Sequence, residues 1–150
     1  LEWWLLEHDL HKGVQAWMRD LNHFYKDSKA LFEKQFSPEG FEWIEHADWE
    51  NSVLTYLRKG ENEKDVVAVA CNFTPVQRDG YRFGVPFGGE WQQVLNSDEV
   101  KYGGSGVGNP KVILAKEEAV HGKDFSLEVV LPPLSVVIFE PVQKKLKTKK

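Results

Sequence analysis

Hydrophobic positions near the beginning of the chain recur at the three- and four-residue spacing of one helical face. The members of this stripe are Val14, Trp17, Met18, Leu21, Phe24 and Tyr25. A second, shorter helix is predicted over residues 28–34, with Asp27 as its N-cap, before the turn-forming run Ser37-Pro38-Glu39-Gly40. Two short helices cannot bury this much apolar surface between them, so part of it is expected to face a neighbour.

From residue 41 onward the hydrophobic period changes to that of β-strands. Seven short segments bounded by Gly, Asn, Asp or Pro are candidates: FEWIEHAD, SVLTYLRKG, DVVAVACNFT, YRFGVPF, EWQQVLN, FSLEVVL and LSVVIFEP. Residues 66–71 are continuously apolar, which predicts a central strand covered on both faces. Alternation of Leu127, Val129 and Leu131 with their neighbours indicates one covered face. Strands without intervening helices predict a mainly β protein, an antiparallel β-sandwich preceded by a helical segment.

The composition indicates a globular protein of one ordinary domain. Of its 150 residues, 41% are hydrophobic and 28% charged, and the net charge of −4 supplies no basic field for nucleic acid. Cys71 has no second cysteine to pair with, and no stretch has the pattern of a signal peptide or a membrane span. We therefore expect a soluble, cytoplasmic protein.

The candidate catalytic and metal-binding groups lack the spacing that their chemistry needs. No Lys-Ser/Thr follows the glycines of YGGSGVGNP, and KVIL after Pro110 indicates a strand, which argues against a phosphate loop. The five histidines show no metal-ligand spacing. Glu117 and Glu118 would point to opposite faces of a strand, and Cys71 within an apolar strand is expected to be inert. We predict no catalytic residue, cofactor or metal in this chain.

Aromatic side chains offer a remaining binding chemistry, because an exposed ring can pack on the apolar face of a sugar. Residues 72–109 hold three candidates, Tyr81, Trp91 and Tyr102. Aromatic residues on strands more often belong to the core, and that alternative stays open for each of them.

Several stretches together carry a resemblance to a known family. They are GVQAWMRDLNHFYKDSKALFE, GFEWIEHADWENSVLTYLRKG, VACNFTPVQRDGYRFGVPFGGEWQQVLNSD, YGGSGVGN and LPPLSVVIFEP. In this order and spacing, the chain resembles the C-terminal end of the glycogen (1,4-α-glucan) branching enzymes of the α-amylase family, from residue 1 to about residue 141. Since Leu1 is not a Met and opens within an apolar run, we expect the chain to be part of a longer protein.

The resemblance implies an organisation in three parts. In that family a catalytic (β/α)₈ barrel precedes an all-β C-terminal domain. Residues 1–38 would be the last, incomplete helical segment of the barrel, residues 39–142 the all-β domain, and residues 143–150 a basic, disordered tail. The parent enzyme would transfer α-1,4-glucan chains to form α-1,6 branches in glycogen biosynthesis, by a scheme like that of retaining glycosidases. Its catalytic carboxylates lie upstream, so the isolated chain is expected to be inactive.

The resemblance also implies where the glucan would be contacted. The expected carbohydrate-binding residues are Leu1, Glu2 and Trp3, near the barrel rim, and Trp91 in the β domain. The expected partners are α-glucan, glycogen or amylose, through the parent enzyme, and the barrel in cis. Neither nucleic acid nor a membrane is expected.

Two alternatives stay open at this point. The first is an autonomous glucan-binding β-sandwich module, which needs exposed aromatic rings and affinity without the barrel. The second is a protein-interaction domain anchored by Trp3, Trp4 and Trp17, since tryptophan is enriched at binding hot spots.

Overall fold

The computed structural model describes residues 2–143. Its helical segment comprises η1 (Trp3–Glu7), α1 (Asp9–Asp27), α2 (Lys29–Phe32) and η2 (Pro38–Gly40). The predicted apolar stripe lies within α1. The second helix is shorter than predicted, and its N-cap is Ser28 and not Asp27, because α1 runs on through Asp27.

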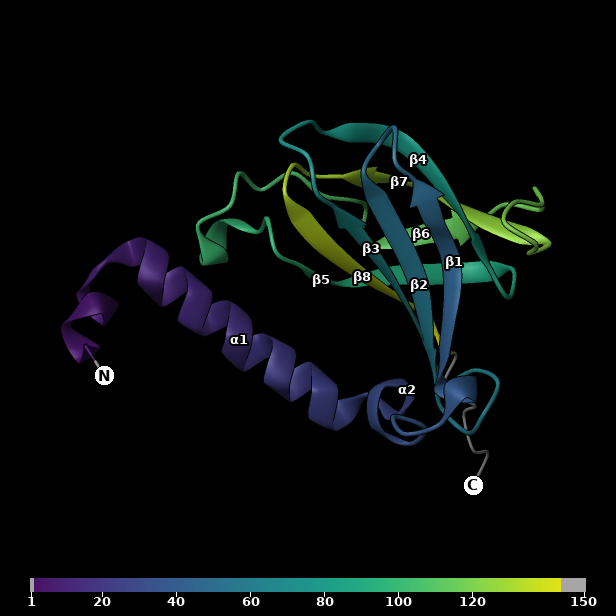
Figure 1. Cartoon of the computed structure of the whole chain (residues 1–150), viewed down its shortest axis with the longest axis horizontal. Coiled ribbons are helices and arrows are strands. Elements are labelled where there is room, and N and C mark those ends of the chain that lie inside the picture. Colours follow the sequence, from purple (N-terminus) through teal and green to yellow (C-terminus); the bar gives the residue numbers. More distant parts are fainter. Residues whose placement is uncertain (1, 144–150) are drawn as a thin grey trace, which may run out of the picture.

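Eight strands follow the helices, and they form the predicted antiparallel sandwich (Figure 1). The strands are β1 (Phe41–Asp48), β2 (Val53–Lys59), β3 (Val66–Asn72), β4 (Arg78–Val85), β5 (Gly89–Asn96), β6 (Val112–Ala115), β7 (Phe125–Leu131) and β8 (Ser135–Pro141). A short helix η3 (Val100–Tyr102) interrupts the β5–β6 connection. The six-stranded sheet has the order β1-β2-β3-β8-β5-β6, and β4 pairs with β7 in a second sheet.

The core lies between these two sheets. Phe83 of β4 and Leu127 of β7 face Phe139 of β8 and Leu57 of β2, and all four side chains are fully buried. The predicted alternation of β7 is confirmed, since Leu127, Val129 and Leu131 all point into this core.

A second apolar cluster covers the outer face of the large sheet. It contains Val67, Val69 and Cys71 of β3, and Trp17, Leu21 and Phe24 of α1 pack against its edge. Strand β3 is therefore buried on both faces, as its unbroken apolar run predicts. Figure 1 shows α1 running from α2, beside the beginning of β1, out past the sandwich toward η1.

The contact between α1 and the sandwich is made mainly through η3. Gly13 is the one buried residue of α1, and a Cβ there would overlap the carbonyl oxygen of Tyr102. The Tyr102 hydroxyl donates to Asp20 Oδ2 at 2.7 Å, and its ring meets that of Trp17 edge-on at 5.2 Å. We call Gly13, Trp17, Asp20 and Tyr102 the helix latch.

Candidate functional site

Four aromatic rings gather on the outer face of the large sheet, at its β1–β2 edge. Trp43 stacks on His46 with ring centroids 5.6 Å apart, and Phe41 meets Trp43 edge-on at 4.9 Å. Tyr56 of β2 stacks on Phe41 at 5.3 Å. We call Phe41, Trp43, His46 and Tyr56 the aromatic platform.

A β-bulge makes this grouping possible. Trp43 pairs with Tyr56, but Glu45 pairs with Thr55, so β1 carries an extra residue between these two positions. Because side chains alternate along a regular strand, Trp43 and His46 would otherwise point to opposite faces. The bulge keeps Ile44 in the core and brings His46 to the face of Trp43.

The aromatic platform is exposed and firmly supported. Trp43 and Phe41 keep 47% and 38% of their surface accessible, although both lie on a strand of the large sheet. Arg58 on β2 donates to the carbonyl oxygens of Gly40 and Leu31, each at 3.1 Å, which fixes the beginning of β1 against the helical segment. Burial raises the pKa of Tyr56, so its hydroxyl stays protonated and can donate a hydrogen bond. This arrangement suits a neutral ligand with one apolar face.

Trp91, predicted to face sugar, lies elsewhere. Its side chain is fully buried in the core between the sheets, its ring stacks beside that of Phe87, and its Nε1 donates to the Phe87 carbonyl oxygen at 3.2 Å. The prediction of Trp91 as a sugar-facing residue is wrong for this fold, because the core leaves neither face of the indole accessible.

The two tyrosine candidates also have structural roles. Tyr81 donates to Asp48 Oδ2 at 2.8 Å, and burial together with this carboxylate raises the Tyr81 pKa. Tyr102 is buried within the helix latch. For both residues the core alternative describes the observed environment.

The predicted residues at the beginning of the chain lie far along α1 from the aromatic platform. Leu1 lies outside the described residues. Glu2 and Trp3 border an open pocket of about 350 Å³, together with Leu5, Leu6, His11, Val14 and Gln15. Trp3 is 67% exposed, so its ring is free to contact a ligand or a neighbouring segment.

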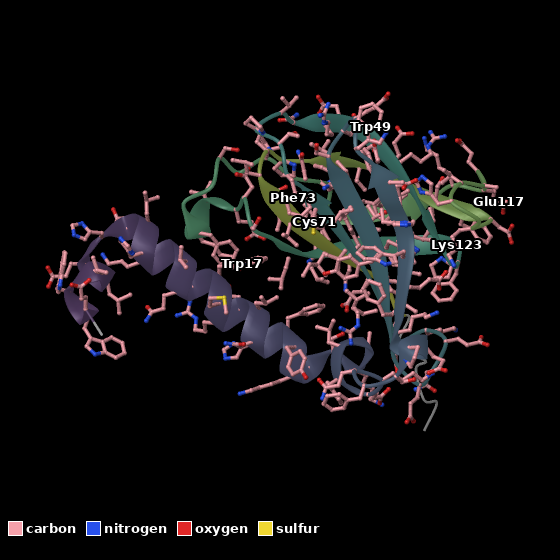
Figure 2. The ribbon with its side chains drawn as sticks, in the orientation of Figure 1. Trp17, Trp49, Cys71, Phe73, Glu117 and Lys123 are labelled. Carbon is pink, nitrogen blue, oxygen red and sulfur yellow. The ribbon has the colours of Figure 1, made fainter. Side chains whose placement is uncertain are left out.

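The charged side chains near the β6–β7 connection are engaged in ion pairs. Arg82 bridges Glu118 and Glu128, and Lys116 reaches Glu128 at 2.8 Å. Hydrogen bonds from Lys116 and Arg82 lower the pKa of Glu128 to about 2. Figure 2 shows Glu117 and Lys123 at this end of the sandwich, away from Trp17 on α1. Glu118 and Glu128 therefore serve surface ion pairs.

The residues that could hold a metal do not converge in the described part of the chain. Within residues 2–143, no group of three or more His, Cys, Asp and Glu side chains has the proximity that a metal ion requires. Cys71 is a free, buried thiol whose pKa is raised by that burial. No helix among these residues is long and apolar enough to cross a membrane.

The strands form an all-β sandwich, and the helical segment packs on the outer face of its larger sheet. Residues 43–142 match the family model described as alpha amylase, C-terminal all-beta domain. The chain belongs to this family.

Three relatives among curated proteins match the chain over most of its length. The chain is 50% identical over 137 residues to the 1,4-alpha-glucan branching enzyme GlgB of Aquifex aeolicus, which covers 91% of this chain and 22% of that protein. It is 50% identical over 141 residues to GlgB of Cereibacter sphaeroides, covering 94% and 19% of the two chains. GlgB of Halothermothrix orenii is 42% identical over 144 residues, covering 96% and 23%. The predicted resemblance is confirmed, and the chain spans about a fifth of the length of these relatives.

The sequence held a signal for the aromatic platform that our prediction missed. In FEWIEHAD, Phe41 and Trp43 share one face of the strand while Ile44 takes the other. A strand whose two faces are both apolar has one face for the core and one for another contact.

Proposed function

We propose that this chain is the C-terminal domain of a cytoplasmic 1,4-α-glucan branching enzyme of glycogen biosynthesis. The names and identities of its relatives support the proposal. In it, residues 39–142 form the all-β domain, and the helical residues before them complete the catalytic barrel. The chain carries none of the catalytic carboxylates, and its contribution is to cover and stabilise the barrel.

The observation that carries this assignment is that the apolar face of α1 is only partly covered. One edge of this face packs on the sandwich through the helix latch. The adjoining edge presents an apolar row at helical spacing, exposed to between 41% and 70%: Leu10, Val14, Met18 and Tyr25. An apolar row of this kind marks an interaction site. Since the sandwich covers only part of the apolar face, the row is available to the rest of the enzyme.

A chimera tests the assignment. The matching segment of the Aquifex aeolicus GlgB would be replaced by this chain, and branch formation on amylose measured by debranching and chain-length analysis. We expect the chimera to form α-1,6 branches, whereas the chain alone forms none. Val14→Asp with Met18→Asp should abolish branching, because two charges would enter the barrel interface. The matched control, Lys12→Asp with Lys26→Asp, changes exposed polar positions of α1 away from the helix latch and should retain activity.

Two results would contradict the assignment. One is branch formation by the chain alone, and the other is full activity of the Val14→Asp, Met18→Asp chimera. If the exposed row instead joins two copies of the isolated chain and they stay joined in the chimera, the alternative of a protein-interaction domain is favoured.

A second candidate function, contact with the α-glucan itself, is favoured by the aromatic platform. Trp43 offers an exposed ring, and supporting rings hold it in place. Indole surfaces supply large contact area at low entropic cost, and a neutral glucan needs no charged partner. We propose that the aromatic platform binds α-glucan, and that Glu2 and Trp3 offer a further contact near the barrel.

Affinity electrophoresis in gels with and without glycogen tests this candidate. We expect the chain to be retarded by glycogen, and Trp43→Ala to weaken binding about tenfold, the loss that a removed aromatic contact of about 1.4 kcal/mol produces. Leu114→Ala is the matched control, because Leu114 is exposed on β6 at the opposite edge of the same sheet. Equal mobility of wild type and Trp43→Ala in glycogen would overturn the candidate.

A further inference from the structure

A second exposed apolar surface lies at the end of the sandwich where β1 and β3 finish. Three connections meet there: the β1–β2 turn, the β3–β4 loop and the β7–β8 turn. They present Trp49 (80% exposed), Phe73 (59%), Val76 (51%) and Leu134 (69%). We call these four side chains the tip patch. Figure 2 shows Trp49 at the top of the sandwich and Phe73 between Trp49 and Trp17 of α1.

Backbone hydrogen bonds hold the three connections together. The Phe73 amide donates to the Ser52 carbonyl oxygen at 3.1 Å, and the Leu134 amide donates to the Thr74 carbonyl oxygen at 2.9 Å. The buried side chain of Asn72 donates to the carbonyl oxygens of Val76 and Pro132, at 2.8 and 2.9 Å. The tip patch is therefore a pre-arranged surface, which lowers the entropy lost on binding.

Leu134 adds an independent observation. Its φ is +48°, in the left-handed region that a leucine rarely adopts. The same turn could be made by glycine without strain, yet here it carries a large apolar side chain that contributes little to the core. Strained residues of this kind concentrate at functional sites.

The size of the tip patch indicates what it binds. Four side chains of this exposure offer a few hundred Å², whereas a stable protein interface needs about 800 Å² from each partner. The four side chains alone fall below that area and are large enough for a few sugar rings. Thr74 and Gln77, next to Phe73 and Val76 in the chain, carry polar groups that can bond sugar hydroxyls. Thr74 Oγ1 donates to Asn72 Oδ1 at 2.8 Å, and Gln77 Nε2 donates to Asp79 Oδ1 at 2.6 Å.

Strand β1 connects the tip patch to the aromatic platform. Trp49 follows Trp43 by six residues, and at about 3.3 Å per residue the two rings lie no more than about 20 Å apart along the strand. A glucan polymer is long enough to touch both. We infer that the tip patch, centred on Trp49, is a second α-glucan contact that continues the aromatic platform along β1. This inference rests on the proposed glucan binding.

The experiment follows the indole N–H signals of Trp43 and Trp49 in NMR spectra of the 150-residue chain, assigned by the two alanine variants. Maltotriose is the short probe and glycogen, by affinity electrophoresis, the long one. We expect maltotriose to shift both signals, and Trp49→Ala to leave the Trp43 shift in place. For glycogen, Trp49→Ala should weaken binding about fivefold. Phe36→Ala, at an exposed aromatic position between α2 and η2, is the matched control.

The outcomes separate the two claims. A Trp43 shift without a Trp49 shift, together with unchanged glycogen binding by Trp49→Ala, overturns the tip patch and leaves the aromatic platform. A Trp49 shift alone overturns the aromatic platform and, with it, the claim that the tip patch continues it. If maltotriose shifts neither indole signal, both the aromatic platform and the tip patch are overturned as glucan contacts. If sedimentation shows a dimer of the chain that Trp49→Ala dissociates and glucan does not affect, the tip patch binds a second copy and the inference is wrong.

Discussion

The sandwich and helix α1 bury their apolar residues in opposite ways. Leu57, Phe83, Leu127 and Phe139 are fully buried between the sheets, so the sandwich encloses its own core. Of the 19 residues of α1, only Gly13 is buried, although the helix carries a broad apolar face. The sandwich therefore has a complete core of its own, whereas only part of the apolar face of α1 is packed against another element.

The largest expected effect comes from removing the side chain of Phe139. Phe139→Ala should lower the free energy of unfolding by about 3–5 kcal/mol, because it leaves a cavity at the centre of the core. Met18→Ala, on the exposed side of α1, should change it by no more than about 0.5 kcal/mol. Urea unfolding followed by circular dichroism measures both. Comparable losses of unfolding free energy from the two variants would mean that the Met18 side chain is packed as fully as that of Phe139.

A smaller effect is expected at the helix latch. In Gly13→Ala the new methyl group would overlap the Tyr102 carbonyl oxygen, so α1 must move away from η3. We expect a loss of about 1–3 kcal/mol, as for other overpacked positions, and a weaker near-ultraviolet signal from Trp17. Gln15→Ala, at an exposed position one half-turn away, is the control. A Gly13→Ala protein with unchanged stability and spectrum would show that the helix latch does not hold α1.

Acid should loosen the same contact. The hydrogen bond from Tyr102, followed by that from Lys101, lowers the pKa of Asp20. A carboxyl whose folded pKa is depressed stabilises the fold above its unfolded pKa, and this contribution is lost as pH falls through the folded value. We expect the Trp17 signal to weaken below about pH 4. Asp20→Asn should remove the part of this pH dependence that arises at the helix latch, whereas an identical titration in that variant would assign it to other carboxylates.

The smallest expected effect concerns Cys71, which lies in the cluster between the sheet and the helices. Burial raises its pKa, so little thiolate is present at neutral pH and reaction with a disulfide reagent should be slow. Gly13→Ala should accelerate the reaction a few-fold if α1 helps to shield the thiol. An unchanged rate would mean that the sheet alone protects Cys71.

The sequence predicted the helices and strands better than it predicted which aromatic side chains are exposed. The stripe within α1, the doubly buried β3 and the alternation of β7 follow from periodicity, because each buries an apolar face whatever its partner. The N-cap at Asp27 was wrong by one residue, since α1 includes Asp27 and Ser28 caps α2.

The aromatic platform was harder to predict from the sequence, because periodicity does not say which apolar face of a strand is exposed to solvent. Trp91 lies between Glu90 and Gln92, and Trp43 lies between Glu42 and Ile44. Trp91 is covered by the second sheet, whereas Trp43 lies at an edge that neither sheet nor helix covers. The stacking of His46 on Trp43 depends on a bulge that local sequence does not specify.

Amide hydrogen exchange tests most directly whether the sandwich is closed while α1 needs a further partner. The chain is measured alone and within the Aquifex aeolicus GlgB chimera. We predict that β3 and β8 exchange slowly and equally in both, whereas α1 exchanges quickly in the isolated chain and becomes protected along its whole length in the chimera. Protection of α1 equal to that of β3 in the isolated chain would contradict the account, because the helix would then need no further partner.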